Sequence, residues 1–254
     1  MPIDIRLAQP PMSAEILTST VHYHDASGDL SFRGFLARPH QGDARRPGVL
    51  VVPEWWGLDA YARRRAEQIA RLGYVALAVD MYGDGITTRD AATAAALARD
   101  TRTGAVARER INCALRVLRE QPEVDPNRIA AVGFCFGGSV ALELARSGAE
   151  IRGAACFHGS LATPTPARPE TLKASILVMN GADDSFVSKN ELQAFEDEMR
   201  AAGADWQLLS LGGAVHSFSN AAADAAGIPG LAFHARSERR AWRAFEDFLL
   251  EVFS

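Results

Sequence analysis

Short apolar runs alternate with amphipathic segments along most of the chain. The runs are too short for helices and almost wholly apolar, which is typical of strands buried on both faces. They occupy residues 47–52, 74–79, 129–132, 175–180 and 205–211, with a further strand ending at residue 157. Apolar positions repeat at helical spacing in residues 59–72, 90–99, 105–120, 138–144, 189–202 and 235–253. This alternation predicts a mostly parallel sheet with helices on both faces.

The beginning of the chain follows a different pattern. Residues 21–24 and 32–37 alternate in polarity on either side of a turn at Gly28 and predict an antiparallel hairpin. We find no internal repeat and no low-complexity linker. We therefore expect one α/β domain over residues 1–254, with residues 1–19 as a loosely held N-terminal arm.

Composition narrows the class of protein. A chain of 254 residues is long enough to bury a full core, and 48% hydrophobic with 23% charged residues is ordinary for a globular protein. The net charge of −4 gives no reason to expect nucleic acid or an anionic membrane as partner. No signal peptide or membrane-length apolar run is present. We expect a cytoplasmic protein, a monomer or small homo-oligomer, that acts on a small molecule.

The three cysteines are Cys113, Cys135 and Cys156. Their spacing fits neither a zinc site nor a disulfide framework, so we expect no metal and no cofactor. Cys113 and Cys156 have apolar neighbours and are predicted to lie in the core.

Cys135 has a different setting. It is the centre of Gly-Phe-Cys-Phe-Gly at residues 133–137, between a predicted strand and a predicted helix. This is the context of a nucleophile elbow, a strained turn whose glycines leave room for the crossing strand and helix. The N–H of Phe136, at the start of the helix, would favour a thiolate and the oxyanion it generates. The alternative is a buried cysteine beside a glycine-rich turn.

Two further loops carry the partners that a nucleophile needs. Asp183 and Asp184 follow the strand at residues 175–180, and His216 lies in a glycine-rich loop after the strand at residues 205–211. Nucleophile, acid and histidine in this order match a hydrolase triad, in which the carboxylate orients the base. Turn and helix-cap chemistry is the alternative for either aspartate, and a polar loop position is the alternative for His216.

Together these motifs resemble the dienelactone hydrolases, a branch of the α/β-hydrolase fold with a cysteine nucleophile. The resemblance extends from about residue 32 to the C-terminus and depends on four blocks. They are residues 52–58 (Val-Pro-Glu-Trp-Trp-Gly-Leu), residues 79–83 (Val-Asp-Met-Tyr-Gly), the elbow, and residues 181–187 with 213–218. The resemblance implies Cys135 as nucleophile, Asp184 rather than Asp183 as acid, and His216 as base.

Glu54 lies just beyond the predicted strand at residues 47–52. A carboxylate between a strand and two tryptophans is unfavourable for packing, because burying it without a partner is costly. The resemblance implies that Glu54 hydrogen-bonds the resting thiol and helps to move its proton, and that the N–H of Trp55 joins Phe136 in an oxyanion hole. The alternative is a loop glutamate paired with an arginine in residues 63–65, which we expect on the solvated face of their helix.

The substrate is expected to differ from the family's. The two arginines with which such enzymes hold the dienelactone carboxylate correspond here to Asp84 and Asn220. An acid and an amide cannot form that clamp, so we expect a neutral ester, lactone or thioester, unless Arg63 supplies the charge. Residues 219–230 are expected to form a mobile flap. The predicted substrate-binding residues are Trp56, Tyr82, Asp84, His158, Phe218 and Asn220.

The sequence thus predicts hydrolysis of a carboxylic ester or lactone through an acyl-thioester on Cys135. The alternative from another class is a non-catalytic protein of the same fold that binds a ligand or partner. A serine hydrolase using Ser139 or Ser160 is disfavoured, because neither serine lies on an elbow.

Overall fold

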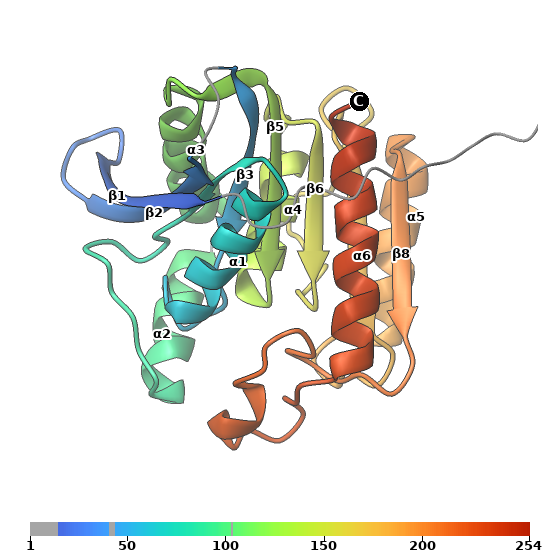
Figure 1. Ribbon diagram of the computed structural model, residues 1–254. Coiled ribbons are helices and arrows are strands. Elements are labelled where there is room, and N and C mark those ends of the chain that lie inside the picture. The colour runs from blue at the N-terminus through green and yellow to red at the C-terminus, as the bar shows by residue number, and fades with distance from the viewer. Residues whose placement is uncertain (1–14, 41–43, 103) are drawn as a thin grey trace, which may run out of the picture.

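The computed structural model describes residues 15–40, 44–102 and 104–254. Within these residues eight strands form one sheet, in the order β1-β2-β4-β3-β5-β6-β7-β8 (Figure 1). The pairs from β4 to β8 are parallel, whereas β1 with β2 and β2 with β4 are antiparallel. The strands are β1 (Ile16–His24), β2 (Ser31–Pro39), β3 (Arg46–Val52), β4 (Val75–Ala78), β5 (Val124–Phe134), β6 (Gly153–Phe157), β7 (Ser175–Gly181) and β8 (Trp206–Leu211). The predicted mostly parallel sheet is confirmed.

Helices cover both faces of this sheet. The strands alternate between two cores, so that Val49 and Val51 of β3 face one core while Leu50 and Val52 face the other. Helices α1 and α6 pack on the first core, on the side towards the viewer in Figure 1, and α3, α4 and α5 pack on the second. The helices are α1 (Ala60–Arg71), α2 (Ala91–Arg102), α3 (Gly104–Arg119), α4 (Phe136–Arg146), α5 (Lys189–Ala202) and α6 (Ala235–Val252).

The predicted N-terminal hairpin is confirmed and is longer than expected. Strand β1 pairs with β2 over its full length, from Ile16 opposite Pro39 to His24 opposite Ser31. The expectation of a loose arm up to residue 19 is therefore wrong for residues 16–19, which are held by ladder hydrogen bonds. The rest of the predicted arm, up to residue 14, lies outside the described residues.

Capping residues explain why several helices begin and end as predicted. Asp59 caps α1 by accepting hydrogen bonds from the N–H groups of Tyr61 and Ala62. Ser188 accepts one from the N–H of Glu191 at the start of α5, and Gly203 ends that helix with φ of 62°. The bounds predicted for α5 are confirmed.

Arg65 corrects one prediction. We expected residues 63–65 on a solvated helix face, but Arg65 is only 4% exposed, whereas Arg63 and Arg64 are exposed. The buried stripe of α1 includes Tyr61, Arg65 and Ile69, which recur at helical spacing. The Arg65 guanidinium lies 4.6 Å from the centre of the Trp242 ring of α6 and donates to the carbonyl of Ser219 at 2.8 Å.

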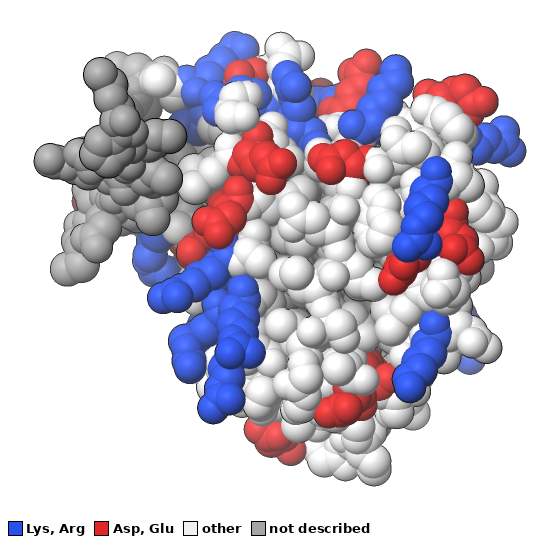
Figure 2. Space-filling view, turned by 90° about the vertical axis from the view of Figure 1, so that its right-hand side faces the viewer, with Lys and Arg blue, Asp and Glu red and all other residues white. Residues whose placement is uncertain are grey.

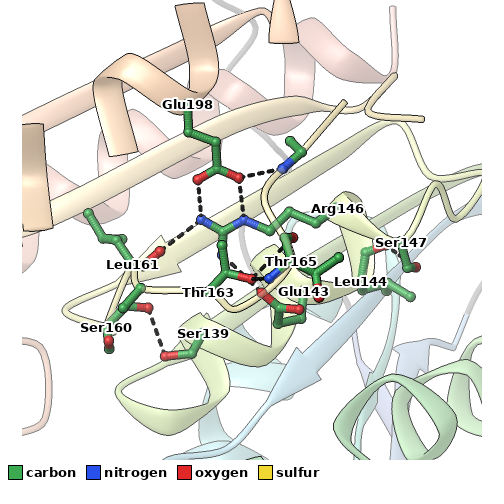
Figure 3. Close-up of polar contacts among 12 residues, drawn as sticks. Ser139, Glu143, Leu144, Arg146, Ser147, Ser160, Leu161, Thr163, Thr165 and Glu198 are labelled. Carbon is green, nitrogen blue, oxygen red and sulfur yellow. Dashed lines mark hydrogen bonds and ion pairs between the residues drawn. The ribbon is translucent and has the colours of Figure 1, made fainter. Parts of the chain in front are cut away.

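A buried ion-pair network holds the segment after β6. Arg146 of α4 donates to both carboxylate oxygens of Glu198 of α5, at 2.9 and 2.7 Å, in the paired contacts seen in Figure 3. The same guanidinium donates to the Leu161 carbonyl at 2.8 Å and to Glu143 at 3.1 Å. Arg146 thereby joins α4, α5 and the loop after β6. His158 is the first residue after β6, and this loop follows it directly.

On the face in Figure 2, basic and acidic side chains lie in small groups of both signs around an uncharged band. In the part of the chain that the structure describes, no helix combines the length and the apolar character needed to cross a bilayer.

Candidate active site

The candidate catalytic residues meet at one edge of the sheet. Glu54, Cys135, Asp184 and His216 follow β3, β5, β7 and β8, respectively. Because these strands are parallel, their carboxyl ends lie at the same edge, the lower one in Figure 1. Residues from four distant parts of the sequence are thereby brought into one site.

The turn at Cys135 has the geometry of a nucleophile elbow. Cys135 has φ of 53° and ψ of −119°, a strained conformation for a residue with a Cβ. A Cβ on Gly137 would collide with the backbone of Val52 and Pro53, and one on Gly133 with the backbone of Gly137. The glycines are therefore required by the close approach of β3, β5 and α4, as the sequence predicted.

The structure places Cys135, His216 and Asp184 in one hydrogen-bonded chain. His216 Nε2 lies 3.1 Å from Cys135 Sγ, and His216 Nδ1 lies 2.8 Å from Asp184 Oδ2. The second oxygen of Asp184 accepts the backbone N–H of Phe186 at 2.8 Å. Asp183 is exposed and instead accepts the N–H of Gly213 at 3.1 Å. Of the two aspartates, only Asp184 is in position to orient His216.

The electrostatic surroundings of His216 favour the charged form of its imidazole. Burial alone would lower the pKa of His216, but the negative charge of Cys135 and the hydrogen bonds with Asp184 and Cys135 outweigh it and raise the pKa to about 10. A raised pKa favours the protonated form of His216, whose Nε2 lies next to Sγ of Cys135. An imidazolium in this position can stabilise a thiolate nucleophile when one forms.

Glu54 is 3% exposed and is held by two neutral donors. Ser217 Oγ donates to Oε1 at 3.0 Å, and Asn220 Nδ2 donates to Oε2 at 2.7 Å. Burial raises the pKa of Glu54, and the hydrogen bonds from Asn220 and Ser217 offset only part of this effect. The alternative that an arginine in residues 63–65 pairs with Glu54 is wrong. The expectation that Glu54 hydrogen-bonds the Cys135 thiol is also wrong: among the described residues, Glu54 binds Ser217 and Asn220, and Sγ of Cys135 contacts His216.

The backbone N–H groups of Phe136 and Trp55 lie beyond the ends of β5 and β3, at the same edge of the sheet. Within the described residues, neither the N–H of Phe136 nor that of Trp55 is donated to a protein acceptor. The N–H of Phe136 opens α4, where the helix dipole is positive. Tyr82 Oη donates to the carbonyl of Trp55 at 2.8 Å and so fixes this part of the loop. That these two groups form an oxyanion hole stays a prediction.

The predicted substrate-binding residues divide into two groups. Trp56 lines a cavity of about 650 Å³ beside the site, and Asn220 reaches the same cavity. His158 and Phe218 are fully buried and pack against each other at 5.1 Å, so they present no surface to a substrate. Tyr82 is 5% exposed with its hydroxyl bound to Trp55, and Asp84 is exposed but does not line the cavity.

The cavity adjoins the triad through Glu54, Ser217 and Asn220, and Cys135 itself does not line it. Two cations lie along its wall, Arg63 of α1 and Arg89. Neither forms an ion pair with any of the described residues, although the Arg63 guanidinium lies 5.3 Å from the centre of the Phe35 ring.

The segment predicted to be a flap is anchored at both ends. Ser219 and Asn220 are buried, and the N–H of His216 donates to the carbonyl of Gly230 at 3.1 Å. Between these anchors the chain forms a short 3₁₀ helix, Ala223–Ala226, that lines the cavity. Its mobility stays a prediction.

Several residues at the site were not predicted. Ser217, next to His216, holds Glu54, and Phe186 is 53% exposed with its ring 5.0 Å from that of His216. The sequence could have indicated both residues, because each lies within two positions of a predicted triad member. Tyr61 and Ser219 are joined by a 2.7 Å hydrogen bond and are 158 residues apart, a contact that no local pattern indicates.

The parallel sheet, the elbow between β5 and α4, and the order of Cys135, Asp184 and His216 define an α/β-hydrolase. The family model of the dienelactone hydrolase family matches residues 32–253. The chain therefore belongs to the dienelactone hydrolase family, as the sequence motifs indicated.

Three relatives illustrate the similarity. The crystal structure of a dienelactone hydrolase-like promiscuous phosphotriesterase from metagenomic libraries shares 39% identity, with a TM-score of 0.87 and coverage of 94% of this chain and 99% of that one. An uncharacterised Caenorhabditis elegans protein is 38% identical over 148 residues, which are 57% of this chain and 93% of the relative. A Bradyrhizobium protein named "Probable 2-oxo-3-(5-oxofuran-2-ylidene)propanoate lactonase" is 29% identical over 72% of this chain and 77% of its own.

Proposed function

We propose that this protein hydrolyses a carboxylic ester or lactone with Cys135 as nucleophile, His216 as base and Asp184 as the orienting acid. The observation that carries the proposal is the continuous contact from Sγ through the imidazole to the carboxylate, at 3.1 and 2.8 Å. All three groups lie at the edge of the sheet where this fold carries its chemistry.

In the first half-reaction the Cys135 thiolate attacks the acyl carbon. The N–H groups of Phe136 and Trp55 hold the oxyanion, each donor contributing about 3 kcal/mol to stabilising the transition state. When the tetrahedral intermediate collapses, the bond to the leaving oxygen breaks. That oxygen takes the proton from the His216 imidazolium and departs as the alcohol, or as the freed hydroxyl of an opened lactone.

In the second half-reaction water replaces the alcohol. Neutral His216 takes a proton from water as the oxygen attacks the acyl-thioester, and collapse of the new intermediate expels the Cys135 thiolate. The product is the carboxylic acid, and the thiolate–imidazolium pair is restored. Asp184 keeps Nδ1 of His216 occupied throughout, so that Nε2 faces the reacting atoms.

Before substrate binds, Cys135 is proposed to rest as a thiol, and Glu54 to help move the thiol proton when substrate arrives, so that the thiolate–imidazolium pair exists only during turnover. The carboxyl of Glu54 accepts hydrogen bonds from Ser217 and Asn220 in the present structure, so acting on Cys135 requires a new contact. Its burial and raised pKa support a role in proton movement, because such a group accepts a proton more readily than an exposed glutamate.

The substrate class follows from the cavity and the relatives. The lactonase named above supports a lactone, and the cavity has room for a small molecule. Asn220 faces Glu54 and Asp84 is exposed outside the cavity, so neither offers an anion clamp. We propose a neutral ester, lactone or thioester as substrate, with Arg63 and Arg89 as the cations available to an anionic one.

The test is hydrolysis of a small panel by the wild type, Cys135→Ala and the control Cys113→Ala. The panel contains an activated acetyl ester, a simple lactone, a thioester, a dienelactone and a phosphotriester, the last because of the relative named for that activity. We expect the wild type and Cys113→Ala to turn over an ester or lactone, and Cys135→Ala to fall to background. Equal rates above background for all three proteins would mean that Cys135 is not the nucleophile, and background rates for all three would favour the non-catalytic, ligand-binding alternative.

A further inference from the structure

His158 makes an unexpected contact with the backbone of the nucleophile. The N–H of Cys135 lies 2.9 Å from the carbonyl oxygen of Phe157 and 3.2 Å from Nδ1 of His158. A backbone N–H only donates, so Nδ1 must accept and carries no proton. The neutral ring then has its proton on Nε2.

That proton has an acceptor on the loop of the base. His158 Nε2 lies 2.7 Å from Ser219 Oγ, which in turn lies 2.7 Å from the hydroxyl of Tyr61. We call Cys135 N–H, His158, Ser219 and Tyr61 the His158 chain. Ser219 comes three residues after His216, so the His158 chain joins the turn of Cys135 to the loop that carries His216.

The surroundings keep His158 uncharged. The ring is fully buried, with the ring of His216 at 5.4 Å and that of Phe218 at 5.1 Å. Burial first, and then the positive charges of His216 and Arg65, hold the pKa of His158 well below its usual range. A proton on Nδ1 would place two N–H donors against each other at Cys135. His158 therefore stays neutral while its neighbour His216 is charged.

We propose that His158 is a positioning residue that holds the strained turn of Cys135 in register with His216. The inference rests on the proposed function. Cys135 has φ of 53°, and a non-glycine residue persists in such a conformation only where its surroundings hold it. Without His158 the turn loses one of its two N–H acceptors and its link to Ser219, and the 3.1 Å contact between Sγ and Nε2 of His216 loosens.

Three variants test separately the two contacts of His158, one with Cys135 and one with Ser219. His158→Phe fills the space but offers neither contact. His158→Asn places an amide oxygen near the position of Nδ1 and so retains an acceptor for Cys135. Ser219→Ala leaves the ring in place and removes its partner. The control is His24→Phe, the same substitution at an exposed strand position.

The measurement is the rate at which iodoacetamide alkylates Cys135, from about pH 5 to about pH 9, read from the mass of the peptide that contains it. It needs no substrate. We expect His158→Phe to slow alkylation at neutral pH about tenfold, to move the profile to higher pH, and to lower kcat 10- to 100-fold with KM changed less than about threefold. His158→Asn should recover most of the rate, and His24→Phe should match the wild type.

The outcomes distinguish the two proposals. A folded His158→Phe variant with the wild-type alkylation profile and kcat would overturn the positioning role. If the wild type hydrolyses no ester, yet the variant still shifts alkylation, the positioning role holds and the hydrolase function fails. If His158→Phe does not fold, the Ser219→Ala variant provides the test. Slower alkylation of Cys135 in this variant would support the positioning role of the His158 chain, and an unchanged rate would overturn it.

Discussion

The side-chain amide of Asn220 donates to Oε2 of Glu54 at 2.7 Å, so the amide at the expected position of a cation is bound to a buried carboxyl. Ser217 holds the other oxygen at 3.0 Å. Within the part of the chain that the structure describes, Glu54 is satisfied by neutral donors and forms no ion pair, which is consistent with the raised pKa that burial gives it. The amide that stands at the expected position of a cation therefore also determines the hydrogen bonding of Glu54.

Removing the amide of Asn220 should destabilise the fold. Asn220→Ala leaves Oε2 of Glu54 buried without a partner, which costs about 1 to 3 kcal/mol in the free energy of unfolding. Urea denaturation measures this loss. The control is Asn190→Ala in the exposed first turn of α5, where a change within about 0.5 kcal/mol is expected. Equal stability of the two variants would mean that Glu54 is hydrated or bound elsewhere.

Adjacent aspartates provide a matched pair at the triad. Asp184→Asn removes the carboxylate from Nδ1 of His216 and lets the wrong tautomer form, so kcat should fall about a thousandfold or more. Asp183→Asn keeps an oxygen that can accept the N–H of Gly213 on the exposed side of the turn, and its kcat should stay within about twofold of wild type. Steady-state kinetics on an activated ester compare the two. Equal losses would place the acid elsewhere.

Arg63 is the cation that we expect an anionic substrate to meet. It lines the cavity that reaches Glu54, whereas its neighbour Arg64 is exposed and lies outside it. For an ester with a carboxylate far from the scissile bond, Arg63→Ala should lower kcat/KM about tenfold, equivalent to about 1.4 kcal/mol. A neutral ester of the same length should be unaffected, as should both substrates with Arg64→Ala. A uniform loss on both esters would assign Arg63 a structural role.

The sequence predicted those features that local rules determine. The alternation of apolar runs and amphipathic segments led to the parallel sheet, because a strand buried on both faces cannot retain polar positions. The elbow was predictable because Gly133 and Gly137 lie where any Cβ would meet crossing backbone. Asp59 and Gly203 marked helix ends through capping and left-handed geometry.

The contacts that the sequence did not reveal join distant segments. His158 was expected to touch substrate, but its ring bonds Ser219, 61 residues away, inside the protein. The Phe218 ring meets that ring edge-on and does not line the cavity. Arg65 was expected on a solvated face because arginine is seldom buried, yet aromatic rings and the Ser219 carbonyl surround it. Such partners become neighbours only once α1, α6 and the loop after β8 have packed.

The network in Figure 3 should contribute strongly to stability. Arg146 is 2% exposed at its side chain and binds Glu198 through two hydrogen bonds, so Arg146→Ala leaves a buried carboxylate unpaired and should cost about 3 to 5 kcal/mol. The control is Arg200→Ala, which removes exposed pairs with Glu196 and Asp197 and should cost at most about 1 kcal/mol. Urea denaturation of both variants tests the difference. Similar losses would show that water replaces the Arg146 contacts.

Acid stability offers a test of His158 that is independent of catalysis. In the unfolded chain this histidine titrates near 6.5, whereas in the folded protein its pKa lies well below that value, because of burial and the charges of His216 and Arg65. Below pH 6.5 the unfolded state therefore binds a proton that the folded state does not. The stability that this neutral ring confers is fully present above that pH and is lost as the pH falls through the folded pKa.

His158→Asn should remove this dependence, because asparagine does not titrate. Above about pH 7 the wild type and the variant should differ in unfolding free energy by a constant amount, and below about pH 6 the wild type should lose up to about 1.4 kcal/mol per pH unit relative to the variant. Urea denaturation at several pH values gives the difference curve, and His24→Asn, at an exposed position, should retain the wild-type slope. Parallel curves for wild type and His158→Asn would mean that the ring binds a proton in the folded protein, and that Cys135 N–H does not depend on it as an acceptor.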